Sequence, residues 1–306
     1  TLYQINITLG KPLLVISGNH DSRERLNYGR KWFKATDFHI NTALDQAHIP
    51  VSIGDIDFYL LPHIEVLEAR NYFEDDTIVS HQDAYNKVVE KINGRLETDK
   101  TNILVGHLYL SDSIASDSER PLSMGLSEAV SEDTFSKFDY SLLGHLHHPF
   151  AVNSEKSFYS GSLLKYSFSE HKQPKGYRII DTNKKKVSFI PLEPKHDVAV
   201  FTGDYEAIVN ETVKFKDNDA YFKFELSNMS YVTEPMSKIK MIYPNTLELK
   251  PLVEDRSSEL QTVDMTTTSD VDIYQSFIET TLDRSVTDFD KTMFKSYFAG
   301  VHNETD

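Results

Sequence analysis

Short apolar runs bounded by turn residues recur along the first two thirds of the chain. The clearest are LLVI at 13–16, ILV at 103–105 and LL at 142–143. Runs of this length between turn residues are typical of strands buried on both faces of a sheet. Polar segments with helical spacing lie between them, at 81–97 and 126–138. The alternation predicts an α/β domain over residues 1–195.

The later part of the chain changes character. Runs at 58–62, 158–162 and 177–181 predict further strands of the first domain, and DTNKKK at 181–186 predicts an exposed hairpin turn. After Pro191 and Pro194, residues 196–252 contain alternating β-rich runs. We expect a small α+β domain there.

The C-terminal part divides into a polar stretch and an apolar one. Residues 253–269 are rich in Ser, Thr and acidic residues and predict a linker. Residues 270–302 show helical spacing of large apolar side chains, namely Ile273, Phe277, Ile278, Phe289, Met293, Phe294, Tyr297 and Phe298. The pattern leaves two interpretations open: helices that dock on the chain's own core, or a helical hairpin that binds a partner.

Composition excludes some classes of protein. The 306 residues include no cysteine, which excludes disulfide frameworks and zinc–thiolate sites and fits a cytoplasmic location. No apolar stretch is long enough to span a membrane. The net charge of −15 argues against a broad basic surface for nucleic acid. Two divalent ions bound in a cleft would make the local electrostatic potential positive and so could attract nucleic acid there.

Three of the predicted strands end in glycine followed by a metal-binding type of residue. The motifs are GNHD at 18–21, GH at 106–107 and GHLH at 144–147. Because ligand sites of α/β sheets lie at the carboxyl ends of strands, we expect the side chains to gather at one edge of one sheet. Glycine there would let the backbone turn sharply. The predicted ligands, which suit a divalent ion such as manganese, are Asn19, His107, His145 and His147.

The order GNHD, GH, GHxH resembles the later motifs of the calcineurin-like metallophosphoesterases. The run GSLLKYSFSE at 161–170 is similar to the SbcD family of bacterial nuclease subunits within that superfamily. The resemblance covers essentially the whole chain and is strongest over 12–22 and 103–170. It implies a metallophosphoesterase β-sandwich flanked by helices, with an α+β capping domain at 196–252 and an SbcC-binding helical segment at 270–302.

The resemblance also implies roles for individual residues. Asn19, His107 and His145 match ligands of one metal ion, and His147 matches a ligand of a second. His20 matches the catalytic histidine that contacts the scissile phosphate. Two divalent ions, taken as Mn²⁺, are implied as cofactors. The implied partners are DNA and an SbcC-type coiled-coil ATPase, with an SbcD homodimer inside a heterotetramer.

The implied function is a metal-dependent DNA nuclease, with double-strand exonuclease and single-strand endonuclease activity, in repair, recombination and replication. The family's opening motifs, Asp-x-His and Gly-Asp-x-x-Asp, do not occur before Asn19. We therefore expect this sequence to be N-terminally truncated and inactive alone. Two alternatives stay open: a phosphoesterase acting on small phosphoesters or cyclic nucleotides, and a non-catalytic scaffold. The remaining histidines, including His63 and His81, are assigned structural roles.

Overall fold

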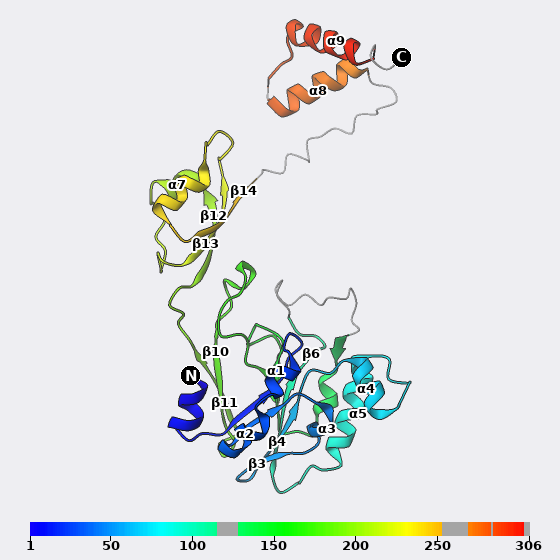
Figure 1. The fold of residues 1–306 in the computed structure, drawn as a ribbon. Coiled ribbons are helices and arrows are strands. Elements are labelled where there is room, and N and C mark those ends of the chain that lie inside the picture. Colours follow the sequence, from blue (N-terminus) through cyan, green and yellow to red (C-terminus); the bar gives the residue numbers. More distant parts are fainter. Residues whose placement is uncertain (115–127, 253–268, 283, 303–306) are drawn as a thin grey trace. The chain divides into compact units, whose positions relative to one another are not determined.

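The structure is a computed structural model that describes residues 1–114, 128–252, 269–282 and 284–302 (Figure 1). The chain divides into two compact units, Thr1–Lys250 and Pro251–Asp306. The first unit mixes sheets and helices, which confirms the predicted α/β fold class. The predicted linker at 253–269 lies, except for residue 269, outside the described residues. The predicted division at residue 195 stays a prediction.

A five-stranded sheet forms the centre of the first unit. Its strand order is β3-β4-β5-β8-β9, parallel throughout except for the antiparallel β3–β4 pair. Gly54 (φ +61°) turns the chain between those two strands. The strands are β3 (Val51–Ile53), β4 (Ile56–Leu61), β5 (Thr101–His107), β8 (Tyr140–Gly144) and β9 (Ser157–Tyr159). Apolar side chains of these strands pack with α5 (His81–Asn93) in one buried cluster.

The strand that leads to GNHD does not belong to this sheet. β1 (Leu13–Ile16) pairs in parallel with β2 (Phe38–Asn41) as a separate two-stranded sheet. The expectation of a single sheet edge was therefore wrong for this motif. Two hydrogen bonds connect the pair to the larger sheet: the Asn41 amide donates to the carbonyl of Leu60 (2.6 Å), and the His63 N–H donates to the carbonyl of Ser17 (2.9 Å).

The predicted helix at 126–138 was wrong for its described residues, 128–138. Its residues Ala129–Val130 form β7, which pairs in parallel with β6 (Tyr109–Leu110), and Glu132–Phe135 form the short 3₁₀ helix η5. Burial of Val130 and Phe135 in the main core outweighs the helical spacing of this segment. The remaining helices before this point are η1 (Gln4–Thr8), α1 (Arg23–Asn27), α2 (Arg30–Phe33), η2 (Lys34–Thr36), α3 (Leu44–Ala47) and α4 (Val66–Phe73).

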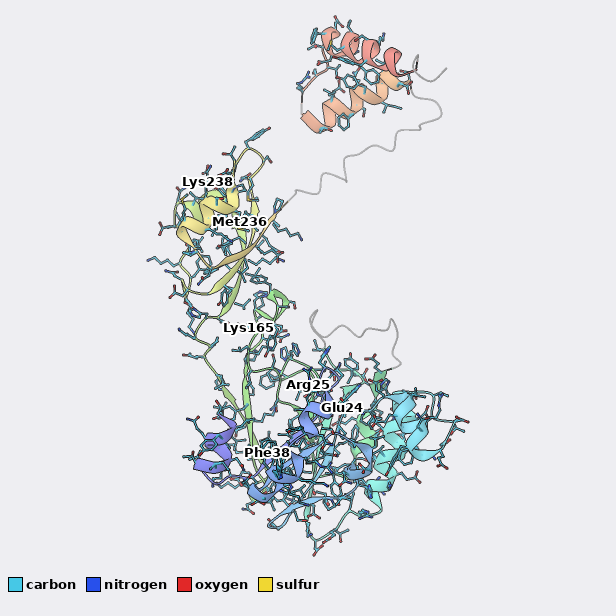
Figure 2. The ribbon with its side chains drawn as sticks, viewed as in Figure 1. Glu24, Arg25, Phe38, Lys165, Met236 and Lys238 are labelled. Atoms are coloured by element: carbon cyan, nitrogen blue, oxygen red, sulfur yellow. The ribbon has the colours of Figure 1, made fainter. Side chains whose placement is uncertain are left out.

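Residues after 160 form smaller elements. The predicted hairpin is present as β10 (Gly176–Asp181) and β11 (Lys186–Pro191), following the 3₁₀ helix η6 (Phe168–Glu170). A separate aromatic-rich core then forms around a sheet of order β12-β13-β14. Its elements are β12 (Val198–Asp204), α6 (Tyr205–Val209), β13 (Tyr221–Ser227), α7 (Pro235–Ile242) and β14 (Thr246–Pro251), with Met236 and Lys238 of α7 labelled in Figure 2.

The described residues of the second unit form two helices, α8 (Asp270–Leu282) and α9 (Asp288–His302). They pack through Tyr274 and Phe294, whose rings stack with centroids 4.4 Å apart. Ile278 is buried, whereas Phe277, Phe289 and Tyr297 are each at least 60% exposed. The two helices therefore bury only part of the apolar surface that their sequence carries. No helix in the described part of the chain is long and apolar enough to cross a membrane.

Candidate metal centre

The structure brings Asn19 and His107 together from different sheets. Asn19 lies three residues after β1, and His107 is the last residue of β5. The Asn19 Oδ1 atom lies 3.0 Å from Nε2 of His107. Two neighbouring ligands of one octahedral ion, each about 2.1 Å from it, are separated by about this distance. The pair therefore fits a shared divalent ion without rearrangement.

Two glycines enclose the His107 ring. A Cβ atom on Gly18 would lie 2.6 Å from Cε1 of His107, and one on Gly144 would lie 3.0 Å from Nδ1. Neither glycine has a positive φ angle. Close packing of the imidazole against their backbone leaves no room for a side chain at either position, and the expectation that these glycines also serve a sharp turn stays a prediction. The glycines of GNHD and GHLH thus pack against His107 of the GH motif at 106–107.

His145 completes this group, in an unfavourable backbone conformation. Its φ of +106° is rare for a residue with a side chain. Its ring lies edge-on to that of His107 at 5.4 Å between centroids and edge-on to Tyr109 at 6.2 Å. Strained conformations of this kind persist where the surrounding structure holds them, often at functional sites.

His147 packs against a different segment, residues 162–175. Its Nδ1 atom lies 2.9 Å from Oε1 of Glu170, and the other carboxylate oxygen lies 2.7 Å from Nζ of Lys175. Glu170 is fully buried and Lys175 nearly so. A histidine whose Nδ1 is held by a carboxylate presents Nε2 as a metal ligand, which is the usual arrangement in metal sites.

Burial sets the charge state of His107. Desolvation, followed by the neighbouring His145, His63 and His20, lowers the pKa of His107 to about 3. The imidazole is therefore neutral at physiological pH and can bind a metal ion without first losing a proton. A neutral imidazole nitrogen of His107 is a suitable ligand for a divalent ion.

The other residues of GNHD have separate roles. His20 is exposed and close enough to His107 to lower its pKa, so it lies beside the group. The Asp21 carboxylate accepts a hydrogen bond from the Gly18 N–H (2.7 Å), which stabilises the turn. The assignment of Asn19, His20, His107, His145 and His147 as site residues stays a prediction.

The sequence pattern did not indicate two further features. Glu170 was part of the run 161–170, but nothing in that run pointed to His147. Within the described residues, His63, Glu65 and His81 place one ligand atom each within 4.8 Å of one another. His63 follows β4 directly after Leu61-Pro62, so a strand-end signal was present there, with proline in place of glycine. Burial lowers the pKa of His63 as well.

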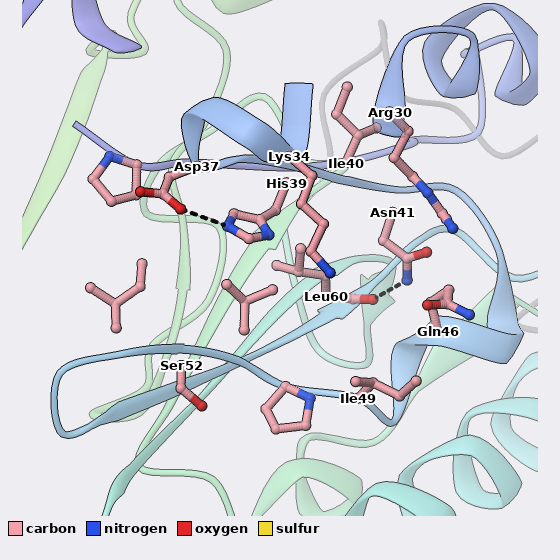
Figure 3. A pocket seen from close by; sticks show the side chains of 14 residues that line it. Arg30, Lys34, Asp37, His39, Ile40, Asn41, Gln46, Ile49, Ser52 and Leu60 are labelled. Carbon is pink, nitrogen blue, oxygen red and sulfur yellow. Dashed lines mark hydrogen bonds and ion pairs between the residues drawn. The ribbon is translucent and has the colours of Figure 1, made fainter. Parts of the chain in front are cut away.

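A separate cavity of about 430 Å³ lies between β2 and β3 (Figure 3). Arg30, Lys34, His39 and Asn41 are among its lining side chains. None of the predicted site residues lines it. The cavity therefore offers no support for the predicted chemistry.

Comparison with known proteins identifies relatives along most of the chain. No protein-family model matches it. The SbcD subunit of nuclease SbcCD from Staphylococcus epidermidis (strain ATCC 12228 / FDA PCI 1200) is 43% identical over 287 residues, covering 93% of this chain and 77% of that protein. The SbcD subunit of nuclease SbcCD from Staphylococcus saprophyticus is 46% identical over 251 residues, covering 81% and 67%. With this identity over this much of both chains, the protein belongs to the SbcD family of SbcCD nuclease subunits.

Proposed function

We propose that this chain is the nuclease subunit of an SbcCD-type complex and that it hydrolyses phosphodiester bonds of DNA with two divalent ions, taken as Mn²⁺. The observation that carries the proposal is the contact of Asn19 with His107 beside His145, in a chain whose relatives are named as SbcD subunits of nuclease SbcCD. The finer activities are double-strand exonuclease and single-strand endonuclease action in DNA repair and recombination. Absence of cysteine supports a cytoplasmic setting.

The described residues support this chemistry in distinct ways. Two divalent ions, when bound, polarise the phosphodiester and lower the pKa of water. Neutral His107 and the Asn19 oxygen would hold one ion together with His145. His147, oriented by Glu170, would hold the other. His20 is exposed, outside the buried core, and can donate a proton to the leaving oxygen.

The second unit is proposed as the surface that binds an SbcC-type ATPase. The exposed rings of Phe277, Phe289 and Tyr297 lie on two helices that bury little apolar surface between them. Aromatic side chains of this kind are enriched at protein interfaces, and helices pack well on coiled coils. We propose that the assembly contains a homodimer of this subunit within a heterotetramer.

The proposal is tested by comparing substrates with the purified protein, carrying the family's opening Asp-x-His and Gly-Asp-x-x-Asp motifs, and its ATPase partner, because this sequence is expected to be inactive alone. We expect manganese-dependent cleavage of single- and double-stranded DNA, and loss of that cleavage in Asn19→Ala. Asn27→Ala, a change at an exposed asparagine on α1, is the matched control and should leave cleavage intact. Hydrolysis of cyclic nucleotides without cleavage of DNA would overturn the proposal in favour of a small-molecule phosphoesterase.

A further inference from the structure

The side chains of His63, Glu65 and His81 form a cluster that the proposed nuclease centre does not use. His63 and Glu65 lie in the segment between β4 and α4, and His81 is the first residue of α5. One ligand atom from each lies within 4.8 Å of the other two. We propose that these three residues bind one zinc-class divalent ion, at a site separate from Asn19, His107, His145 and His147.

The spacing of the donors fits such an ion. His63 Nε2 lies 3.4 Å from Oε1 of Glu65, and the rings of His63 and His81 are 6.0 Å apart. Ligand atoms about 2.0–2.1 Å from a tetrahedral zinc ion are about 3.3–3.4 Å apart. The His63–Glu65 pair is therefore already at ligand spacing. His81 has to approach by no more than about 1.4 Å, which a small side-chain rotation provides.

The backbone that carries the donors is held from several sides. The His63 N–H donates to the Ser17 carbonyl, and Arg23 donates to the His63 carbonyl (2.6 Å). Arg23 also forms an ion pair with Glu68 of α4. On the other side, Ser80 and Asp83 form a capping box that begins α5 immediately before His81. Preorganisation of this kind lowers the entropic cost of binding an ion.

Burial and composition favour a metal ion over a simple ion pair. Glu65 is 65% exposed, so its interaction with His63 in water is weak. His63 is only 15% exposed, so its imidazole is largely withdrawn from water, and its Nε2 atom faces the Glu65 carboxylate. Two imidazoles and one carboxylate form the donor set that zinc accepts while keeping a fourth position open.

A small cavity lies beside the cluster. His63 and His81 line a cavity of about 10 Å³, together with His145 and Glu128. That volume is about the space one water molecule needs. The positive end of the α5 dipole opposes a cation at His81, and the carboxylate of Asp83 in the first turn offsets this. An ion here would join the β4–α4 segment to α5 beside His107, whose ring lies 6.1 Å from that of His63.

Metal titration of the full chain tests the proposal. Chelator-treated wild-type protein, His81→Ala, Glu65→Gln and the control His39→Ala are titrated with Zn²⁺ by calorimetry and with Co²⁺ by visible absorption. We expect wild type and His39→Ala to bind one more equivalent of zinc than His81→Ala, with tetrahedral Co²⁺ bands that His81→Ala lacks. Glu65→Gln, at an exposed position that does not endanger folding, should weaken this binding at least about 10-fold.

A variant of the proposed nuclease centre distinguishes failure of this inference from failure of the nuclease proposal. His147→Ala should retain the zinc-class equivalent even though it alters the proposed nuclease centre. Equal stoichiometry and equal Co²⁺ spectra in wild type and His81→Ala would overturn the inference. Binding in the millimolar range only, which marks an adventitious ion, would overturn it as well.

Discussion

The imidazole of His147 and the carboxylate of Glu170 are 2.9 Å apart, and the carboxylate is completely buried. The ammonium of Lys175, itself nearly buried, lies 2.7 Å from the same carboxylate and balances its charge. Two residues 23 positions apart are thus joined in a chain that runs from lysine through carboxylate to histidine. This arrangement fixes which nitrogen of His147 faces the predicted metal centre.

Replacement of Glu170 should show how far metal binding by His147 depends on the orientation of its ring. In Glu170→Gln the amide no longer matches both His147 and the Lys175 ammonium. We expect manganese affinity to fall about 10–100-fold, because partners of metal-binding histidines tune affinity by this amount. Leaving the lysine charge buried should also cost about 3–5 kcal/mol of unfolding free energy. Glu155→Gln, at an exposed position, is the control; identical manganese isotherms for the two variants would contradict the role.

Gly18→Ala should displace His107. The added methyl would lie 2.6 Å from the ring, closer than carbon atoms approach, so the imidazole or the backbone has to move. A misplacement of about 1 Å can reduce catalytic rate about 10²-fold. Gly94→Ala, whose added methyl would meet nothing closer than 3.7 Å, is the matched control. Nuclease rates of the two variants within about twofold of each other would show that close packing of the ring on Gly18 is not required.

The lowered pKa of His107 has a consequence for stability. The folded protein holds this group deprotonated down to a pKa of about 3, whereas the unfolded chain binds a proton near pH 6.5. The unfolded state therefore binds more protons between these values, and the stabilisation is present above pH 6.5 and declines as the pH falls toward 3. We expect the unfolding free energy of the metal-free protein, measured by urea denaturation, to fall less steeply from about pH 7 to about pH 4.5 in His107→Gln than in wild type. Parallel slopes for wild type and variant would contradict the assignment.

His20 should act in chemistry and not in metal binding. It is exposed and lies beside His107, where an acid could reach a leaving oxygen. We expect His20→Asn to keep most manganese binding by calorimetry and to lose about 10²–10⁴-fold in turnover, the contribution typical of a positioned acid. Metal loss as complete as in His107→Ala would instead make His20 a ligand.

The exposed aromatic residues of the second unit should determine partner binding. Tyr297→Ser removes a ring that is 71% exposed, so the fold should lose little stability. We expect at least about 10-fold weaker association with an SbcC-type ATPase, since aromatic side chains dominate interface energetics. Tyr231→Ser, at a fully exposed tyrosine of the first unit, is the control. If Tyr297→Ser lowers the melting temperature and leaves association unchanged, the helices dock on their own protein.

Local residue preferences account for most of the elements around the predicted centre. The apolar runs that end at 16, 105 and 143 form β1, β5 and β8, because buried strands need continuous apolar side chains. The hairpin turn before Lys186 and the turn at Gly54 also follow from such preferences. The segment 128–138 shows the limit of this reasoning, since its contacts with β6 and the core overrode its helical spacing.

Which side chains meet depends on the packing of the whole fold. Asn19 reaches His107 although β1 lies in another sheet, and the carboxylate that orients His147 comes from residue 170. His63 and His81 meet because their neighbours Ile64, Ile78 and Tyr85 pack in one buried cluster. Such distances depend on contacts between segments remote in sequence, and residue periodicity carries no information about them. The glycines of the motifs illustrate both levels: their positions are visible in the sequence, but the imidazole that requires them is visible only in the fold.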